Sequence, residues 1–366
     1  MKQYKAVGIM SGSSMDGVDL VYAHLTEENN KWGYSILASE TVPYEEKWRV
    51  RLSQLGKQNA LIYVKTHTFY GHYLGQLVLS FIQKNNLEVD FIASHGHTIF
   101  HQPNEGYTAQ VGDGAAIHAV SGYPVISDFR LTDVALLGQG APLVPIGDTL
   151  LFGDYDYCLN LGGFTNLSAQ TPSGVVAFDV CPCNIALNRV ARNMGMDYDK
   201  DGAAAATGSI NYDLLKQLDN LSYYDTFEPK SLGREWINAE FWPIVRKFDV
   251  NGVAQKDLMK TLVDHISGAI ADAVEHYTES EIENKKVLVT GGGAFNTTLL
   301  EHIRSQCDAQ FIVPEESQLI EYKEALIFGL LGVLRLRQEN NVLASVTGAK
   351  RDNIGGAMWG DFSKII

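Results

Sequence analysis

The feature that most constrains the fold is a loop of small residues between two apolar runs near the N-terminus. Residues 8–19 read Gly-Ile-Met-Ser-Gly-Ser-Ser-Met-Asp-Gly-Val-Asp, and strand-like runs cover residues 4–9 and 18–23. Glycine and serine let the backbone approach a ligand closely and direct several N–H groups into one concavity, which suits a phosphate. A β-hairpin with a Ser/Gly turn is the alternative, but hairpins prefer a tight two-residue turn. The length of the loop therefore favours a phosphate cradle.

This loop matches neither of the two common phosphate motifs. No G-x-x-x-x-G-K-[ST] follows a strand, so the chain is not a P-loop protein. No G-x-G-x-x-G opens a helix after the first strand, so a Rossmann site has little support. A strand–loop–strand cradle is instead similar to those of the actin, sugar kinase and Hsp70 superfamily. Such a fold requires a second cradle later in the chain.

Two later glycine-rich turns meet this requirement. Residues 155–161 read as a strand, residues 162–166 as a small polar turn, and the strand at 287–290 runs into Gly291, Gly292 and Gly293. The repeated pattern predicts an α/β protein with a duplicated, ribonuclease H-like, actin or sugar kinase fold and a cleft between its lobes. We place the N-terminal lobe at residues 1–147 and the C-terminal lobe at 148–366. Whether the C-terminal tail packs back on the first lobe stays open.

Composition narrows the function classes. A length of 366 residues predicts about two domains. A net charge of −14 argues against a general nucleic-acid binder. No apolar run approaches the ~18 residues that span a bilayer. The four cysteines, Cys158, Cys181, Cys183 and Cys307, show no zinc spacing, and no signal peptide precedes them. We therefore expect reduced thiols in the cytoplasm.

Histidines end the strand predicted at residues 89–94. His95, His97 and His101 have the same parity and could share one strand face. H-x-H is a known zinc-ligand spacing, so a zinc hydrolase is one interpretation. Because no downstream cluster completes a metal site, neutral imidazoles at the rim of a sugar site are the preferred one.

Two charged residues stand at predicted strand ends. Arg130 ends the run 123–130, where α/β folds place ligand contacts, although a solvated loop arginine is the alternative. Asp179 lies between a strand and a predicted helix from Asn184, and a helix N-terminus favours an ionised carboxylate. Asp179 is therefore a candidate general base. The alternative is that it only caps the helix.

Taken together, these motifs resemble the anhydro-N-acetylmuramic acid kinases, cell-wall recycling enzymes of the sugar kinase, actin and Hsp70 superfamily. The resemblance extends over almost the whole chain and is carried, in order, by residues 10–19, 94–98, 128–135, 138–145, 160–166, 199–202, 229–235 and 291–296.

The resemblance implies a reaction and a set of roles. ATP and water convert 1,6-anhydro-N-acetylmuramic acid to N-acetylmuramic acid 6-phosphate in peptidoglycan recycling, and the released O6 takes the γ-phosphoryl group. Asp179 would deprotonate the water, and Mg²⁺ would bridge the phosphates near Asp16, through water. The implied sugar contacts are Thr98, Arg130, Glu324 and His97.

The resemblance also implies the nucleotide site and the partners. A cytoplasmic homodimer is the family expectation, with no nucleic-acid or membrane partner. The implied ATP contacts are Ser11, Gly12, Ser13, Ser14, Met15, Asp16, Gly17, Asp19, Gly162, Gly163, Asn166, Gly291, Gly292, Gly293 and Asn296.

The chain departs from the family at two places. The family usually has Thr-Gly-Pro-Gly-Asn after the catalytic aspartate, whereas residues 180–184 read Val-Cys-Pro-Cys-Asn. His97 stands where glutamine is usual. A kinase for a different sugar and a non-catalytic sensor are therefore alternatives, although the presence of Asp179 argues against the sensor.

Overall fold

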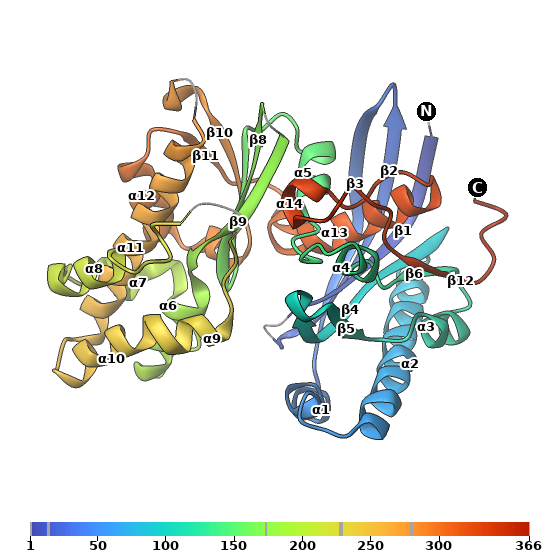
Figure 1. Ribbon diagram of the computed structural model, residues 1–366, viewed down its shortest axis with the longest axis horizontal. Coiled ribbons are helices and arrows are strands. Elements are labelled where there is room, and N and C mark those ends of the chain that lie inside the picture. Colours follow the sequence, from blue (N-terminus) through green and yellow to red (C-terminus); the bar gives the residue numbers. More distant parts are fainter. Residues whose placement is uncertain (1, 13–14, 173, 227–229, 279–280, 366) are drawn as a thin grey trace. The chain divides into compact units, whose positions relative to one another are not determined.

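The computed structural model describes residues 2–12, 15–172, 174–226, 230–278 and 281–365 (Figure 1). The chain forms two compact units, residues 1–151 with 322–366 and residues 152–321. The division predicted at residues 147 and 148 differs from these bounds, because the chain after residue 321 groups with the first unit. Among the described residues, no helix is long and apolar enough to cross a membrane.

The first unit is built on a mixed sheet with the order β12-β6-β4-β1-β2-β3, and β5 pairs with β4. β1, β2 and β3 are antiparallel neighbours, whereas β4 is parallel to β1 and β6 is parallel to β4. The strands are β1 (Lys2–Ser11), β2 (Gly17–Glu28), β3 (Lys31–Pro43), β4 (Phe91–Gln102), β5 (Tyr107–Val111), β6 (Val125–Ser127) and β12 (Ala357–Trp359).

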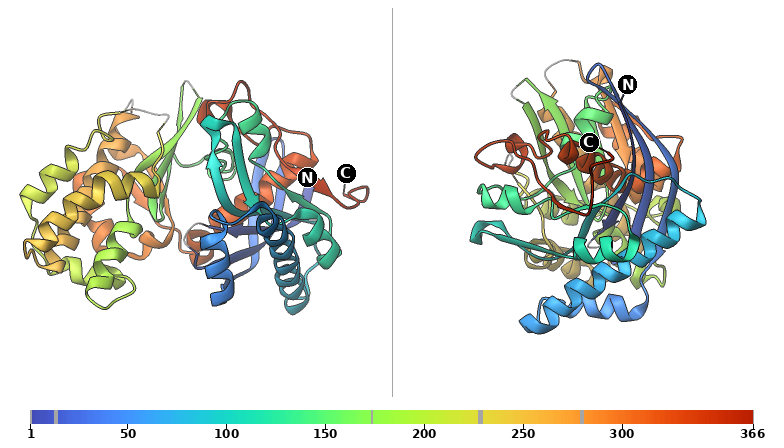
Figure 2. Two further views of the ribbon diagram at one scale, coloured as in Figure 1. Left: turned by 60° about the horizontal axis from the view of Figure 1, so that its bottom comes forward. Right: turned by 90° about the vertical axis from the view of Figure 1, so that its right-hand side faces the viewer.

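Helices cover both faces of this sheet. α2 (Ala60–Lys84), drawn in blue in Figure 2, packs on one face. There Ile9 of β1 shares a buried cluster with Leu74. α13 (Ser317–Leu336) packs on the other face, because Gly8 lies directly against Ala325. The remaining helices of the unit are α1 (Glu46–Leu55), a 3₁₀ turn (Pro103–Glu105), α3 (Gly114–Ser121), α4 (Leu131–Ala135), α5 (Pro145–Leu151) and α14 (Ala344–Thr347).

The second unit has a five-stranded sheet with the order β11-β10-β7-β8-β9. β7, β8 and β9 are antiparallel neighbours, β10 is parallel to β7, and β11 is parallel to β10. The strands are β7 (Tyr157–Leu161), β8 (Phe164–Thr171), β9 (Gly174–Pro182), β10 (Lys286–Thr290) and β11 (Gln310–Ile312).

The core of the second unit forms between this sheet and α11 (Gln255–His276). The apolar stripe of α11, which includes Leu258, Leu262 and Ile266, is fully buried, as its four-residue spacing requires. The other helices are α6 (Asn184–Asn193), α7 (Ala203–Ala206), α8 (Tyr212–Asp219), α9 (Arg234–Trp236), α10 (Trp242–Val250) and α12 (Thr297–Gln306), with a π-helical segment at Ile237–Phe241 and 3₁₀ turns at Lys200–Gly202, Ile282–Asn284 and Gly292–Phe295.

The two sheets share one topology. In each, the first three strands form an antiparallel meander in the spatial order 3-2-1, and the next two principal strands of the unit extend the sheet in parallel beyond strand 1. The duplicated, ribonuclease H-like α/β fold predicted from the repeated loops is therefore confirmed. The cleft between the lobes stays a prediction.

Candidate active site

The first glycine-rich loop connects β1 to β2, as predicted. Ser13 and Ser14 lie outside the described residues. Asp16 is exposed, and its backbone carbonyl accepts the Tyr44 N–H at 3.2 Å. A Cβ on Gly17 would lie 2.4 Å from the backbone oxygen of Val42, so only glycine fits there. The loop after β1 therefore contains one exposed carboxylate, Asp16, and β2 begins at Gly17, where only glycine fits.

The other described members of this loop differ in what they expose. Met15 has a left-handed backbone with φ of +66°, and Gly12 is partly exposed. Asp19 already belongs to β2, and its carboxylate accepts the Thr41 hydroxyl at 2.6 Å. Asp16 is therefore the exposed carboxylate of the described part of the loop, whereas Asp19 is held by a neighbouring strand.

Ser11, the last residue of β1, has its hydroxyl surrounded by protein groups. The Ser11 Oγ lies 2.5 Å from the Tyr44 hydroxyl, 2.8 Å from the His97 Nδ1 and 3.0 Å from the Tyr70 hydroxyl. All four side chains are buried. The Ser11 side chain therefore anchors the start of the loop, which leaves backbone groups to contact an anion.

His95 and His97 do not share a face, so that prediction was wrong. Gly96 between them has φ of +73°, and the pairing of β4 with β1 is irregular at this point. The His95 ring lies 4.8 Å from Phe328 of α13, whereas the His97 ring lies 6.4 Å from Tyr70 of α2, on the other side of the sheet. A β-bulge of this kind re-aims side chains.

The zinc interpretation finds no support in the described part of the chain. His101 Nδ1 bonds to the Thr108 hydroxyl at 3.0 Å, and His95 bonds to Arg130. Among the described residues, no group of three or more histidine, cysteine, aspartate or glutamate side chains could hold a metal ion.

Arg130 is tied into the first unit rather than solvated. Its Nε donates to the His95 Nε2 at 2.9 Å, and its Nη1 donates to the Gly140 carbonyl at 2.6 Å. Burial lowers the pKa of Arg130 to about 10, so it stays a cation at neutral pH. Burial has the opposite effect on the carboxyl group of Glu324 on α13, because it raises the pKa of an acid. The charges of Lys323 and Arg130 oppose that rise. The two predicted sugar-site residues therefore interact electrostatically.

Thr98 follows His97 on β4 and is partly exposed. Its hydroxyl accepts a hydrogen bond from the Gln110 amide of β5 at 3.3 Å. The four residues expected to contact the sugar, Thr98, His97, Arg130 and Glu324, all belong to the first unit.

The second loop, Gly162-Gly163, is closed against the start of α6. The Gly162 carbonyl accepts the Asn184 N–H at 3.1 Å, and the Gly163 carbonyl accepts the N–H groups of Cys183 at 2.9 Å and Ile185 at 3.1 Å. These helix N-terminal donors are therefore used by the loop. Gly163 itself is exposed, and a Cβ there would meet no atom within 4 Å.

The third loop lies beside the second, because β10 and β7 are parallel neighbours. Gly291 has φ of +81°, and a Cβ there would lie 2.5 Å from the Asn160 side-chain oxygen. Gly293 packs against Leu161. Gly292 begins a 3₁₀ turn, Gly292–Phe295, that leads into α12. The Asn296 side chain accepts the Leu299 N–H at 3.0 Å, so it caps α12. The structure thus assigns Asn296 a helix-capping contact that the sequence analysis did not anticipate.

A row of polar residues crosses the second sheet at the level of these loops. Thr290 of β10 pairs with Asn160, Asn160 pairs with Asn166, and Asn166 pairs with Asp179. Because directly paired residues project from the same face of a sheet, the four side chains lie in one line. The predicted Asn166 and Asp179 are therefore neighbours.

Asp179 does not cap a helix, so that alternative was wrong. Its carboxylate accepts the Leu232 N–H at 2.8 Å, whereas the N-cap residue of α6 is Cys183, which makes no side-chain capping bond. Burial raises the pKa of Asp179 to about 6, and the Leu232 N–H partly opposes this shift. Burial therefore outweighs the stabilisation of the ionised form that the sequence analysis expected from a helix N-terminus.

Cys181 and Cys183, at the two positions where the resemblance implies glycine, are part of the core. Cys181 and Cys183 are fully buried, free thiols. Burial raises the pKa of Cys183 to about 12 and that of Cys181 well above its usual range. Both thiols are therefore neutral at physiological pH.

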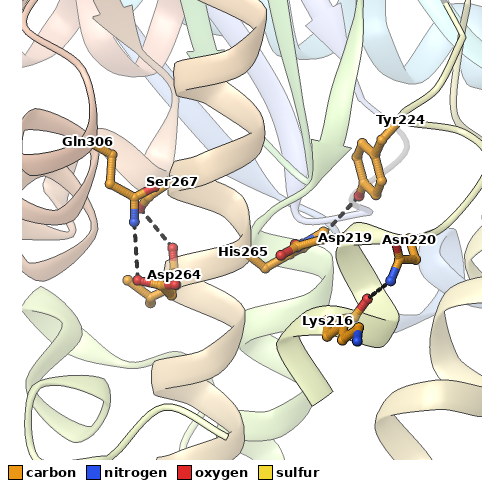
Figure 3. A network of polar contacts seen from close by, with 9 residues as sticks. Lys216, Asp219, Asn220, Tyr224, Asp264, His265, Ser267 and Gln306 are labelled. Atoms are coloured by element: carbon orange, nitrogen blue, oxygen red, sulfur yellow. Dashed lines mark hydrogen bonds and ion pairs between the residues drawn. The ribbon is translucent and has the colours of Figure 1, made fainter. Parts of the chain in front are cut away.

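Behind Asp179 lies a pocket that the sequence analysis missed. It has a volume of about 380 Å³, and Phe178 and Val180 are among its lining residues. On its wall, the buried His265 bonds through Nδ1 to Asp219 at 2.6 Å and through Nε2 to the Tyr224 hydroxyl at 2.8 Å (Figure 3). Because His265 stands within the apolar stripe of α11, its spacing indicated only a core position.

The duplicated sheets, with a glycine-rich loop after β1, β7 and β10, define a two-unit α/β protein of the ribonuclease H-like class. The sequence profile of anhydro-N-acetylmuramic acid kinase matches residues 4–361. The chain belongs to the anhydro-N-acetylmuramic acid kinase family.

Relatives match over nearly their whole length. The anhydro-N-acetylmuramic acid kinase of Francisella tularensis subsp. novicida is 32% identical and covers 96% of this chain and 97% of its own. That of Shewanella loihica is 32% identical, covering 98% and 99%, and that of Haemophilus influenzae is 33% identical, covering 96% and 96%. Among solved structures, the activator of the 2-hydroxyisocaproyl-CoA dehydratase from Clostridium difficile is 12% identical with a TM-score of 0.44, covering 91% and 97%. A TM-score this low supports no functional inference.

Proposed function

We propose that this protein is an ATP-dependent kinase that converts 1,6-anhydro-N-acetylmuramic acid and water to N-acetylmuramic acid 6-phosphate in peptidoglycan recycling. Water adds to the anomeric carbon, the bond from that carbon to O6 breaks, and O6 takes the γ-phosphoryl group of ATP. The anomeric carbon thereby gains a hydroxyl, and ADP leaves.

The observation that carries this proposal is the state of Asp179. A carboxyl group with a pKa of about 6 is ionised in most molecules at neutral pH yet is more basic than an ordinary aspartate. General bases work best when their pKa lies near the operating pH. Its Oδ2 is oriented by the Leu232 N–H at 2.8 Å. We assign Asp179 the removal of the proton from the attacking water.

The glycine loops are suited to a nucleotide. Side chains are absent at Gly17 and Gly291 because a Cβ there would clash with Val42 and with Asn160, which lets the backbone of each loop pack tightly. We assign the triphosphate to backbone N–H groups of the loops after β1 and β7, and the adenosine to the loop after β10. Bound Mg²⁺ would neutralise phosphate charge during transfer. The exposed carboxylate of Asp16 is the residue we expect to hold it, through water.

We assign the sugar to the first unit. Arg130 is a fixed cation that suits the carboxylate of the muramic acid, because a buried guanidinium held by two hydrogen bonds is pre-oriented for an anion. Glu324 and Thr98 offer oxygen atoms to hydroxyl groups. We further propose that the protein is cytoplasmic, since ATP and the free buried thiols fit a reducing compartment. A homodimer remains the expectation that the family resemblance implies.

Mass spectrometry tests this function directly. The protein is incubated with Mg-ATP and 1,6-anhydro-N-acetylmuramic acid, with the Asp179→Asn variant as the control. We expect a product heavier than the sugar by one phosphoryl group and one water, and none with the variant. Unchanged sugar, with nucleotide binding established separately, would contradict the proposal and favour another sugar as substrate.

A further inference from the structure

Three hydroxyl groups beside His97 form a closed hydrogen-bonded ring. The Tyr70 hydroxyl lies 3.0 Å from the Ser11 Oγ, the Ser11 Oγ lies 2.5 Å from the Tyr44 hydroxyl, and the two tyrosine hydroxyls lie 2.5 Å apart. His97 Nδ1 completes the group at 2.8 Å from the Ser11 Oγ. Four contacts therefore join four buried side chains.

Counting protons fixes the direction of each bond. A hydroxyl group has one proton to donate, and Tyr70 donates its proton to Ser11. Tyr44 must then supply the proton between the two tyrosines, and Ser11 must supply the proton between itself and Tyr44. The Ser11 proton is now used. The contact between Ser11 and His97 can be a hydrogen bond only if His97 donates from Nδ1.

The protonation state of His97 then defines its other nitrogen. Burial lowers the pKa of His97 to about 4, so the ring is neutral at neutral pH and has a single N–H. A neutral imidazole with its proton on Nδ1 has a lone pair on Nε2. Within the described part of the chain, no residue donates a hydrogen bond to this atom. The residue as a whole is 4% exposed, so His97 is held in place by its surroundings while Nε2 is left to accept a hydrogen bond from a ligand.

We propose that His97 is held as the Nδ1-protonated tautomer by the Ser11–Tyr44–Tyr70 ring, and that its Nε2 accepts a hydrogen bond from an O–H or N–H group of the bound sugar. His97 is then a specificity-determining residue. The identity of the ligand rests on the function proposed above, whereas the tautomer depends only on the network.

The resemblance implies a glutamine at position 97, and this inference accounts for a histidine there. A glutamine side chain has an NH₂ donor and a carbonyl acceptor, and the Nδ1-protonated imidazole likewise has one donor and one acceptor. The other neutral tautomer would present a donor to the sugar instead. The ring of hydroxyls thereby makes histidine equivalent to glutamine at this position.

The tautomer is read by long-range ¹H–¹⁵N NMR of the ligand-free protein, which separates protonated from unprotonated ring nitrogens. The His97 signals are those absent from the His97→Gln spectrum. We expect a protonated Nδ1 and an unprotonated Nε2 whose resonance shifts when saturating sugar is added. A protonated Nε2 in the wild-type protein, or an Nε2 resonance that the sugar leaves unchanged, would overturn the proposal.

A remote variant separates this inference from simple packing. In Tyr44→Phe, Ser11 loses its acceptor and donates to His97 Nδ1, so the ring proton moves to Nε2. We expect KM for the sugar to rise by about 10-fold or more, because a buried acceptor becomes a donor, with KM for ATP changed by less than about twofold. Tyr73→Phe is the matched control. The aromatic side chain of Tyr73 packs against that of Tyr70, but in the described contacts the Tyr73 hydroxyl takes no part in the hydrogen-bonded cycle of Ser11, Tyr44 and Tyr70. It should leave the tautomer and both KM values unchanged.

The His97 variants complete the test. His97→Gln should keep KM for the sugar within about threefold of wild type, whereas His97→Phe should raise it about 10-fold or more. Equal KM values in these two variants would contradict a sugar contact at Nε2. If the tautomer and the sugar-dependent shift are as expected but no product forms, the proposed function fails and this inference stands.

Discussion

At the scale of single residues, burial decides the chemistry of the candidate site. Asp179 and His97 are both made unusual by loss of water, which raises the pKa of the carboxyl to about 6 and lowers that of the imidazole to about 4. Both shifts favour the uncharged form. The carboxyl therefore becomes a stronger base, and the imidazole becomes a fixed neutral hydrogen-bonding group.

Asp179→Asn should sharply reduce turnover while leaving nucleotide binding intact, because only the proton acceptor is lost. We expect kcat to fall by on the order of 10² to 10⁴ and Kd for ATP to stay within about threefold. Single-turnover kinetics and calorimetric titration measure the two quantities. In the wild-type enzyme, kcat/KM should fall as the pH drops below about 6, since protonated Asp179 cannot accept a proton. Full activity of the variant would remove Asp179 from the mechanism.

The same substitution should stabilise the fold at alkaline pH. A carboxyl whose pKa is raised from 3.8 to about 6 on folding destabilises the folded state where it is ionised, and this cost disappears as the pH falls toward 4. Asp179→Asn removes the cost, which we place at about 1 to 3 kcal/mol. Urea unfolding at pH 8 and at pH 4.5 should show a gain at pH 8 that shrinks at pH 4.5. A gain that is independent of pH would indicate a cause other than this ionisation.

At the scale of elements, the sequence predicted loops better than faces. The three strand–loop patterns were recognisable because glycine and serine cluster visibly between apolar runs. The sheet faces toward which His95 and His97 point were not recognisable. A single left-handed glycine, Gly96, breaks the alternation of side chains between the two faces of the strand that the prediction assumed. Leu232 shows a second limit, since a backbone donor distant in sequence leaves no local pattern. The cap at Asn296 is different, because an asparagine directly before a helix is a recognisable signal.

The packing of α13 on β1 can be tested with two glycines. A Cβ on Gly8 would lie 1.8 Å from the Ala325 backbone oxygen, whereas one on Gly329 would meet its nearest atom, the Ala6 Cβ, at 3.7 Å. Gly8→Ala should lower the free energy of unfolding by about 3 kcal/mol or more through overpacking. Gly329→Ala should raise it by about 0.5 to 1 kcal/mol through helix propensity. Similar urea midpoints for the two variants would contradict this packing.

The burial of Cys181 and Cys183, just before α6, bears on whether either cysteine can act as a redox sensor. A thiol reacts as its thiolate, and both groups are buried with raised pKa values. We expect an aromatic disulfide reagent to label neither cysteine in the native protein at pH 8 on the time scale of free cysteine, and to label all four cysteines in urea. Fast native labelling that peptide mapping assigns to residues 181 or 183 would support a regulatory role.

At the scale of the whole molecule, the two halves share a topology but differ in how the chain builds them. The second unit is one continuous segment, residues 152–321, and its buried cluster draws only on residues within it. The first unit needs two segments, because α13 covers one face of its sheet and β12 pairs with β6. Sequence patterns revealed the duplication but left open whether the C-terminal tail returns to the first unit, because helix periodicity does not identify which sheet a helix covers.

This difference predicts which half folds alone. A fragment of residues 152–321 contains its whole sheet and the α11 core, so it should unfold in urea in a single cooperative transition. A fragment of residues 1–151 lacks α13, which leaves the β1 face around Gly8 exposed to water, so it should show no cooperative transition. Circular dichroism against urea concentration measures both. If the 1–151 fragment showed a cooperative transition while the 152–321 fragment showed none, the C-terminal segment would not be what completes the first unit, and the division at residues 151 and 321 would be wrong. If both fragments behave as expected, the first unit can fold only after residues 322–366 have been synthesised. The second unit, residues 152–321, would then fold before the first unit.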